Sequence, residues 1–284
     1  MRKSNAVILT TIVTLFFGVF FLFPVLMVIG EAFVDNDGGF TFDYLAQIFV
    51  NPIYLEGLWN ALILGVTSTF VALLIAFPLA VLNHRYQFPF KIALSSLILI
   101  PLVLPPFVGA VGVKQMLGVT GSLNAFLEKI GLMDPSAPID WLGEGRFWGI
   151  VIMNALHLYP ILYMNIAASL AHLDPAMEEA AQNLGCSPWR RLRRITIPLS
   201  MPGIFAGGAI VFIWSFTELG VPLVFDYSRV APVQIYDGLK DLDSNPFPYA
   251  LVAVMLVISS AVFLISKAFL GRSKLGTAPR PKAI

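Results

Sequence analysis

The chain has 284 residues, of which 57% are hydrophobic and only 12% are charged, whereas about 25% of the residues in an ordinary soluble domain carry a charge. The formal net charge of +1 gives no indication of a nucleic-acid partner. The single cysteine, Cys186, excludes an internal disulfide and any cysteine-based metal cluster. Composition therefore favours a protein built within a membrane.

Six apolar stretches follow one another along the chain, and each is long enough to cross a hydrocarbon core of about 30 Å. The first is too long for a signal peptide, whose apolar region is about 7–15 residues. Strands of a membrane barrel would be about ten residues long and would alternate in polarity. The sequence thus predicts an all-α membrane protein, one transmembrane domain over residues 1–284, with spans at about 6–30, 58–82, 92–113, 147–171, 200–225 and 247–267.

The Lys and Arg residues of the connections predict how these spans are oriented. Thirteen of the 18 lie on the side that holds both ends of the chain, among them Arg2, Lys3 and Lys282, and the other five lie on the opposite side. Short cytoplasmic connections are the ones enriched in Lys and Arg. We therefore expect both termini in the cytoplasm, and residues such as Asp43 and Asp134 on the outer side.

One outer connection predicts a short helix near residues 122–131. Ser122 is a candidate N-cap, and Gly131 can end the helix in a left-handed conformation. Four apolar side chains recur between them at helical spacing: Leu123, Phe126, Leu127 and Ile130. We interpret this segment as a packing helix on the outer face, because amphipathicity by itself indicates only an interface.

The inner connection between the fourth and fifth spans, residues 173–198, is polar and contains two helix starts. Asp174 and Ser187 each stand before a proline, which places a capping side chain ahead of a proline at the first helical position. Gly185 lies where the first of the two helices should end, and it can adopt the left-handed conformation of a sharp turn. The segment therefore predicts a helix, a glycine turn and a basic helix outside the bilayer, an arrangement that suits a docking element.

This connection contains, in order, Glu179-Ala180-Ala181, three residues, Gly185, nine residues and Ile195-Thr196-Ile197-Pro198. The pattern resembles the EAA loop of permease subunits of binding-protein-dependent ABC importers, which is E-A-A, three residues, G, nine residues and I-x-L-P. Ile197 replaces the usual leucine, and the resemblance extends over nearly the whole chain. It implies a type I importer fold, in which the loop is a coupling helix that docks into a groove on a cytoplasmic ATPase. The residues to which it assigns docking are Glu178, Glu179, Ala180, Ala181, Gly185 and Pro198.

The resemblance also implies the partners of the chain. They are a second permease chain, identical or homologous, two ATPase subunits that carry ATP and Mg²⁺, and a periplasmic binding protein that delivers the substrate at the bacterial inner membrane. The surroundings of the fifth span, residues 212–225, look most like the ferric-iron and polyamine branch, whose members also carry thiamine or phosphonates. Ferric iron or a polyamine-like solute is therefore the expected substrate.

Motifs of catalysis and of metal binding are missing from the sequence. It has no G-x-x-x-x-G-K-[ST] phosphate loop and no H-E-x-x-H pair, so we expect no catalytic residue, metal or cofactor on this chain. Two other classes stay open, a self-sufficient secondary carrier or channel and a non-transporting scaffold. Carriers usually show internal repeats and several intramembrane charges, and neither class explains the docking loop.

Polar residues of the fourth span are candidates for lining a pathway. Asn154 and His157 are three residues apart and share a helix face. Asn165 lies three turns after Asn154 and near the same face, and Tyr159 is a further polar residue of this span. Hydrogen bonding between helices is the interpretation we favour, since such contacts are common in membrane bundles. A pathway lining is the alternative.

Glu218 is the one acidic residue inside a predicted span. Counted from Met201, it lies about 25 Å along the helix, beyond the midplane toward the outer side, and Gly220 and Pro222 can interrupt the helix there. A charged carboxylate within the bilayer is costly and usually faces a cavity or a partner. Three interpretations stay open: a gate or pathway residue, a structural hydrogen bond to the neighbouring permease, and a direct contact with a cation.

Overall fold

The computed structural model describes residues 3–35, 38–143, 146–172, 175–241 and 245–273. Within these ranges every regular element is a helix, apart from one isolated bridge between Val34 and Phe40. Five of the described helices are long and apolar enough to cross a membrane, and six when one bent pair is counted as a span. The chain divides into two compact units, Met1–Asn60 with Arg229–Ile258 and Ala61–Ser228 with Ser259–Ile284.

The first unit begins with α1 (Lys3–Phe17), η1 (Gly18–Leu22) and α2 (Phe23–Glu31), which are continuous and apolar. It also holds α3 (Asp43–Val50), the start of α4 (Pro52–Arg85), α13 (Ala231–Gly238), η4 (Leu239–Asp241) and the start of α14 (Phe247–Ser273). α13 packs on the start of α4, where the Gln234 side chain donates to the Ile53 carbonyl at 2.8 Å and Asn60 donates to the Arg229 carbonyl at 2.8 Å. These polar contacts join α13 and the residues just before it to the start of α4.

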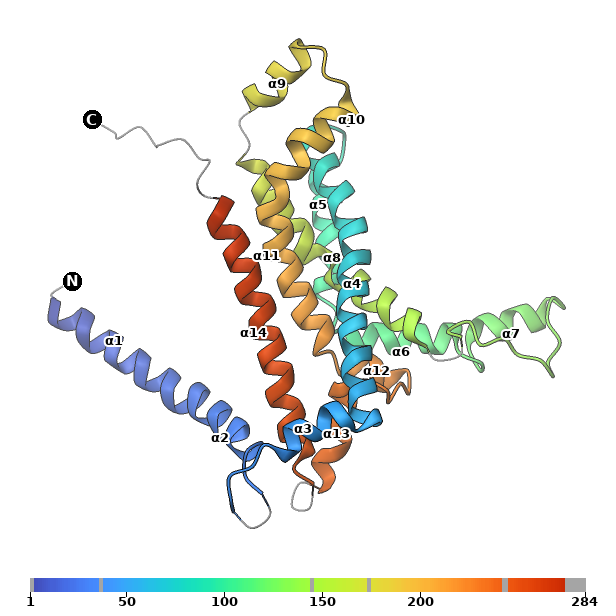
Figure 1. Ribbon diagram of the computed structural model, residues 1–284. Helices are drawn as coiled ribbons and strands as arrows, with labels where there is room; N and C mark the ends of the chain where they lie inside the picture. Colours follow the sequence, from blue (N-terminus) through green and yellow to red (C-terminus); the bar gives the residue numbers. More distant parts are fainter. Residues whose placement is uncertain (1–2, 36–37, 144–145, 173–174, 242–244, 274–284) are drawn as a thin grey trace. The chain divides into compact units, whose positions relative to one another are not determined.

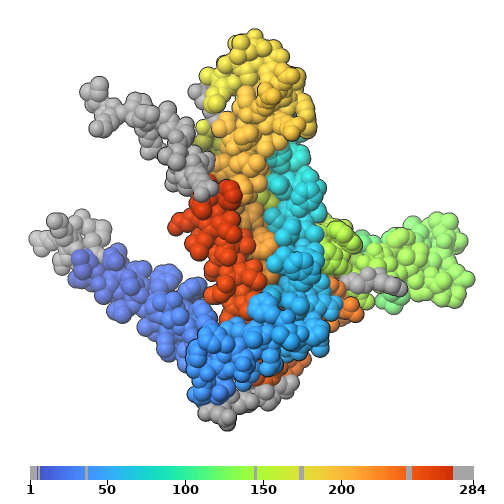
Figure 2. Space-filling model, viewed as in Figure 1, coloured from blue at the N-terminus to red at the C-terminus, as the bar shows by residue number. Residues whose placement is uncertain are grey.

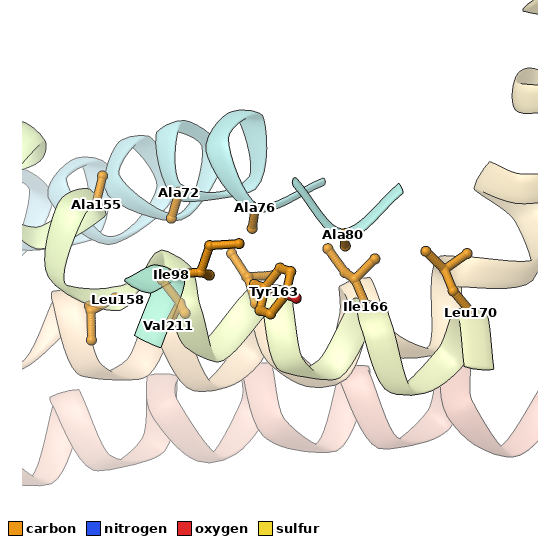
Figure 3. Close-up of a cluster of buried hydrophobic side chains, with 11 residues drawn as sticks. Ala72, Ala76, Ala80, Ile98, Ala155, Leu158, Tyr163, Ile166, Leu170 and Val211 are labelled. Atoms are coloured by element: carbon orange, nitrogen blue, oxygen red, sulfur yellow. The ribbon is translucent and has the colours of Figure 1, made fainter. Parts of the chain in front are cut away.

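The second unit is organised around α8 (Phe147–Ala171), which occupies the residues predicted for the fourth span. Ala72, Ala76 and Ala80 recur every four residues along α4 and face α8, whose Ala155 and Ile166 point toward α4 (Figure 3). Small residues at this spacing let two helices in a membrane approach closely, so that van der Waals contact replaces the hydrophobic drive available in water. The second unit therefore has its core along α8.

α11 (Ile197–Phe216) contacts the other side of α8 through glycines. A Cβ atom added at Gly203 would lie 2.3 Å from the Asn165 carbonyl oxygen, and one at Gly207 would lie 3.1 Å from the Leu162 Cα. Both glycines are therefore needed for the close approach of α11 to α8. Gly208, on the same helix, has no atom nearer than 3.9 Å to its added Cβ.

The predicted third span, 92–113, is not one straight helix. It consists of α5 (Lys91–Leu99), η2 (Ile100–Leu102) and α6 (Pro106–Leu117), and the helix axes on the two sides of the break are bent by 88°. Pro105 is extended, with ψ 134, because a residue that precedes a proline is disfavoured in the helical conformation. The continuous helix predicted here is thus corrected to a broken span.

The fifth span also differs from the prediction at both ends. The basic helix α10 (Pro188–Arg191) is not a separate loop element, because it continues through a π-helical segment, η3 (Leu192–Thr196), directly into α11. At the other end α11 stops at Phe216, and α12 (Gly220–Val224) follows after three residues. Figure 1 shows α10 and α12 at opposite ends of α11.

The short outer helix is α7 (Ser122–Lys129), and Gly131 ends it with φ +73, as predicted. Ser122 is not its N-cap. Gly121 holds that position, with no side-chain hydrogen bond, and Ser122 is the first helical residue. Asn124, to which the sequence analysis gave no role, is buried and accepts a hydrogen bond from the Trp141 indole nitrogen at 2.6 Å. This contact fixes the following loop against α7.

Candidate functional site

The inner connection folds into α9 (Pro175–Asn183), a glycine turn and α10. Gly185 has φ +74, its N–H donates to the Gln182 carbonyl, and the Cys186 N–H donates to the Ala181 carbonyl. These two bonds satisfy the last carbonyls of α9 in the pattern expected of a left-handed helix stop, which confirms the predicted turn. Asp174, the predicted cap of α9, lies outside the described residues.

Ser187 caps α10, as predicted, because its hydroxyl oxygen accepts from the Arg190 N–H at 3.4 Å. The surface of this loop is accessible, and Figure 2 shows α9 and α10 (yellow) at the outside of one end of the second unit. Glu179, Ala180 and Pro198 are exposed, and Leu184 is 88% exposed. The loop thus exposes a carboxylate, small residues and an apolar side chain.

Glu178 is placed differently from its neighbour Glu179. Its Oε1 accepts from the Arg85 Nη2 at 2.8 Å and from the Thr196 hydroxyl at 3.2 Å. Burial raises the pKa of the Glu178 carboxyl, but the hydrogen bond and charge of Arg85, with Thr196 and Arg191, outweigh burial and hold that pKa below its usual range. The Glu178 carboxylate, which the resemblance assigned to docking, is thus turned toward Arg85 and Thr196 of the same chain.

Two polar side chains of α8, those of His157 and Asn165, bond to backbone carbonyls of the second unit. His157 is buried, and its Nδ1 lies 2.9 Å from the Pro101 carbonyl oxygen, so Nδ1 must carry the hydrogen. That carbonyl belongs to the broken third span, where backbone groups freed from the helix need other partners. Asn165 donates to the Ile161 carbonyl at 2.8 Å. Asn154 differs, because its Nδ2 is buried without a hydrogen-bond partner among the described residues.

Glu218 lies in the break between α11 and α12 rather than inside a helix. Its Oε1 accepts from the Gly220 N–H at 2.9 Å and from the Val221 N–H at 3.2 Å, so the carboxylate caps the start of α12. A negative group is favoured at a helix N-terminus, where N–H groups have no partner within the helix. The break thus supplies donors that reduce the cost of a carboxylate in a span.

Two cations close the other end of α12. The Lys114 Nζ donates to the Val224 carbonyl at 2.6 Å and to the Asp226 Oδ2 at 2.5 Å. The Arg146 Nη1 donates to the Phe225 carbonyl at 2.5 Å and to the same Asp226 oxygen at 2.8 Å. The hydrogen bond from Lys114, and after it Arg146, lowers the pKa of the Asp226 carboxyl against an opposing effect of burial. This clamp, formed by Lys114, Arg146 and Asp226, joins α6, the start of α8 and the end of α12.

Arg85, Thr196 and the Lys114, Arg146 and Asp226 clamp have structural roles that the sequence pattern does not indicate. Their partners are 18 to 112 residues away in the chain, so no local pattern indicates them. Among the described residues, no group of three or more His, Cys, Asp or Glu side chains could hold a metal ion.

The structure thus combines apolar helices of membrane-spanning length with an exposed polar loop, formed by α9, the Gly185 turn and α10, at one end of α11, which are features of a multi-pass membrane protein. The family model of the binding-protein-dependent transport system inner membrane component matches residues 72–275. The chain belongs to this family, and it is a multi-pass permease of the inner membrane.

Two curated relatives and one solved structure show the extent of the similarity. The chain is 30% identical over 255 residues to the spermidine/putrescine transport system permease protein PotB of Haemophilus influenzae, covering 86% of each chain. It is 29% identical over 281 residues to the ferric transport system permease protein FbpB of Actinobacillus pleuropneumoniae, covering 93% of this chain and 38% of that protein. A permease of a bacterial ABC transporter that imports alginate has the same fold, with a TM-score of 0.70, 20% identity and 94% coverage of both chains.

Proposed function

We propose that this chain forms part of the translocation pathway of an ATP-driven importer for a cationic solute. The observation that supports it most is the similarity over 86% of both chains to a permease named for spermidine and putrescine. A permease named for ferric iron is similar over most of this chain, so both relatives are named for cations. A polyamine is the solute we propose, and ferric iron is the second candidate.

The proposal includes the partners and the orientation. Two ATPase subunits supply ATP and Mg²⁺ from the cytoplasm, a second permease chain completes the pathway, and a periplasmic binding protein delivers the solute. α10 and η3, at one end of α11, together carry four arginines, Arg190, Arg191, Arg193 and Arg194, whereas Lys114 and Arg146 bond to the residues at the end of α12, at the other end of α11. This excess of basic residues supports a cytoplasmic α9.

The docking role falls to the exposed face of the loop. Docking is assigned to the exposed residues Glu179, Ala180, Gly185 and Pro198 and to the partly exposed Ala181, and Glu179 is the carboxylate available to a basic group of the ATPase. Within the span, Asn154 is the pathway candidate that keeps an unused donor, whereas His157 and Glu218 are engaged by backbone groups. A pathway role for these two therefore requires that their bonds open during transport.

The test first asks whether an ATPase and a periplasmic binding protein are encoded beside this chain, and it then uses them together with the chain. Calorimetric titration of the binding protein with spermidine, putrescine and ferric iron identifies the solute. Uptake into proteoliposomes that contain both permease chains and the ATPase then shows whether transport requires ATP and the loaded binding protein. Uptake that proceeds without either would establish a self-sufficient carrier instead.

A further inference from the structure

A closed polar cluster joins three separate elements at the α9 end of the second unit. Arg85 is the last residue of α4, Glu178 lies on α9, and Thr196 is the last residue of η3. The Arg85 Nη2 donates to both of the others, at 2.8 Å to Glu178 and 2.6 Å to the Thr196 hydroxyl, which in turn donates to Glu178. Each member of the cluster thus contacts both of the others.

The cluster is shielded although two of its members are charged. The Arg85 side chain is 13% exposed, that of Glu178 is 21% exposed, and Thr196 is fully buried. An arginine that only fixes membrane topology needs no such setting and would remain in water. Ions taken out of water are retained where they are paired and hydrogen-bonded, so this geometry requires a further explanation.

Polar bonds, rather than apolar packing, hold α9 in place. None of its described side chains, from Ala176 to Asn183, is buried. Besides the bond of Glu178 to Arg85, the Arg191 Nη1 donates to the Gln182 Oε1 at 3.1 Å and links α9 to α10. Successive residues of a helix are rotated by about 100°, so Glu178 can face the chain while Glu179 faces outward.

We propose that Arg85 is a positioning residue that, through Glu178 and Thr196, makes α9 move together with the inner ends of α4 and α11. When the docked α9 is displaced, the inner ends of α4 and α11 are then displaced with it. Without the cluster, a change of conformation at the Gly185 turn would let α9 move alone. The π-helical segment contributes because it turns Thr196 toward α4, and such segments are frequent at functional sites. This inference rests on the proposed function.

The experiment uses the complex of both permease chains and the ATPase in proteoliposomes, together with the binding protein. Spermidine, putrescine and ferric iron are each loaded, and the probe that wild type takes up is then used for the variants Arg85→Gln, Glu178→Gln and the double variant. Arg193→Gln is the matched control, because Arg193 is exposed on η3 and its replacement removes the same charge. Three quantities are measured: the ATPase that copurifies, ATP hydrolysis, and ATP hydrolysed per solute taken up.

We expect the ATPase to copurify with Arg85→Gln within twofold of wild type, because the outward face of α9 is intact. Uptake should fall at least tenfold while hydrolysis falls less than threefold, so the ATP used per solute rises. The double variant should be no worse than either single variant, since the two side chains act through one contact. Arg85→Lys should recover part of the uptake, and Arg193→Gln should match wild type.

Two results would overturn the inference. One is unchanged uptake in Arg85→Gln, and the other is a loss of copurification that accounts for the whole loss of uptake, because the cluster would then only shape the docking surface. If Arg85→Gln is not inserted, Thr196→Val, which keeps the side-chain volume and removes the hydroxyl, decides by the same three measurements. A wild-type complex without ATP-dependent uptake would refute the proposed function itself, which separates the two failures.

Discussion

The close approach of α11 to α8 depends on Gly203, and replacing it by alanine tests that dependence. The added Cβ would lie 2.3 Å from the Asn165 carbonyl oxygen and 2.5 Å from the Ser169 hydroxyl oxygen. The carbonyl belongs to the α8 backbone and cannot rotate away as a side chain can. The helices must therefore separate locally by roughly 1 Å to reach ordinary van der Waals distance.

The magnitude follows from comparing Gly203→Ala with Gly208→Ala. Overpacking of a tight interface typically costs about 1–3 kcal/mol, whereas Gly208 has only one neighbour, at 3.9 Å. Both variants gain about 0.5–1 kcal/mol from replacing a glycine inside a helix, and this gain cancels in the comparison. Gly203→Ala should therefore be less stable than Gly208→Ala by about 1–3 kcal/mol, which is about 5- to 150-fold in the unfolding equilibrium constant.

The assay is SDS titration in mixed micelles, with tryptophan fluorescence reporting the unfolding of the purified protein. Gly208→Ala should unfold at the wild-type SDS fraction or slightly above it, and Gly203→Ala at a clearly lower one. Equal midpoints for the two alanine variants would refute the argument, because the same substitution on the same helix would then not distinguish a packed face from an open one.

Four further predictions concern the loop, α12 and the orientation. Gly185→Val forces a β-branched residue to φ +74 and costs at least about 1 kcal/mol, so the chain should insert but copurify less ATPase; full copurification would contradict this. Glu218→Gln keeps an oxygen that can cap α12, whereas Glu218→Ala loses it, at about 0.5–2 kcal/mol, so protein abundance should fall for Ala and not for Gln. The Asp226 pKa is lowered, so the stability that wild type has over Asp226→Asn should persist as pH falls to about 4, the usual carboxyl value, and disappear only at more acidic pH; an advantage already lost at pH 5 would contradict the clamp. In a cysteine-free background, an impermeant thiol reagent added outside should label a cysteine at Asp134 and leave one at Arg190 unlabelled.

The helices and their order could largely be predicted because hydropathy alone distinguishes spans from connections. Breaks within spans were harder to predict. Pro78, Pro160 and Pro202 all lie inside continuous helices, since backbone groups freed by a proline find other partners in a membrane bundle. α5, by contrast, ends at Leu99, and three prolines, Pro101, Pro105 and Pro106, lie between it and the second residue of α6. A single proline is thus an ambiguous signal, and several close together are a stronger one.

The candidate site could be predicted only in its local part. The Gly185 turn and the Ser187 cap depend on neighbouring residues, and the pattern of residues was sufficient for both. The partners of Glu178 were not predictable, because Arg85 is 93 residues away and Thr196 is 18 residues away. Two adjacent glutamates read alike in sequence, and only the tertiary structure shows which of them faces inward.

The π-helical segment η3 lies between Gly185 and Pro198, and it determines how a change in the number of residues there would affect the helices on either side. Its wider turn contains one residue more than an α-helical turn, with the Ile197 N–H bonded to the Leu192 carbonyl. Each residue of a helix turns the chain by about 100°, so deleting one residue here would rotate Thr196 and the start of α11 away from α4 or displace α9 by the same angle. The number of residues in this stretch therefore sets an angle between two helices more than it sets a length, and substitutions should be tolerated here far better than insertions or deletions.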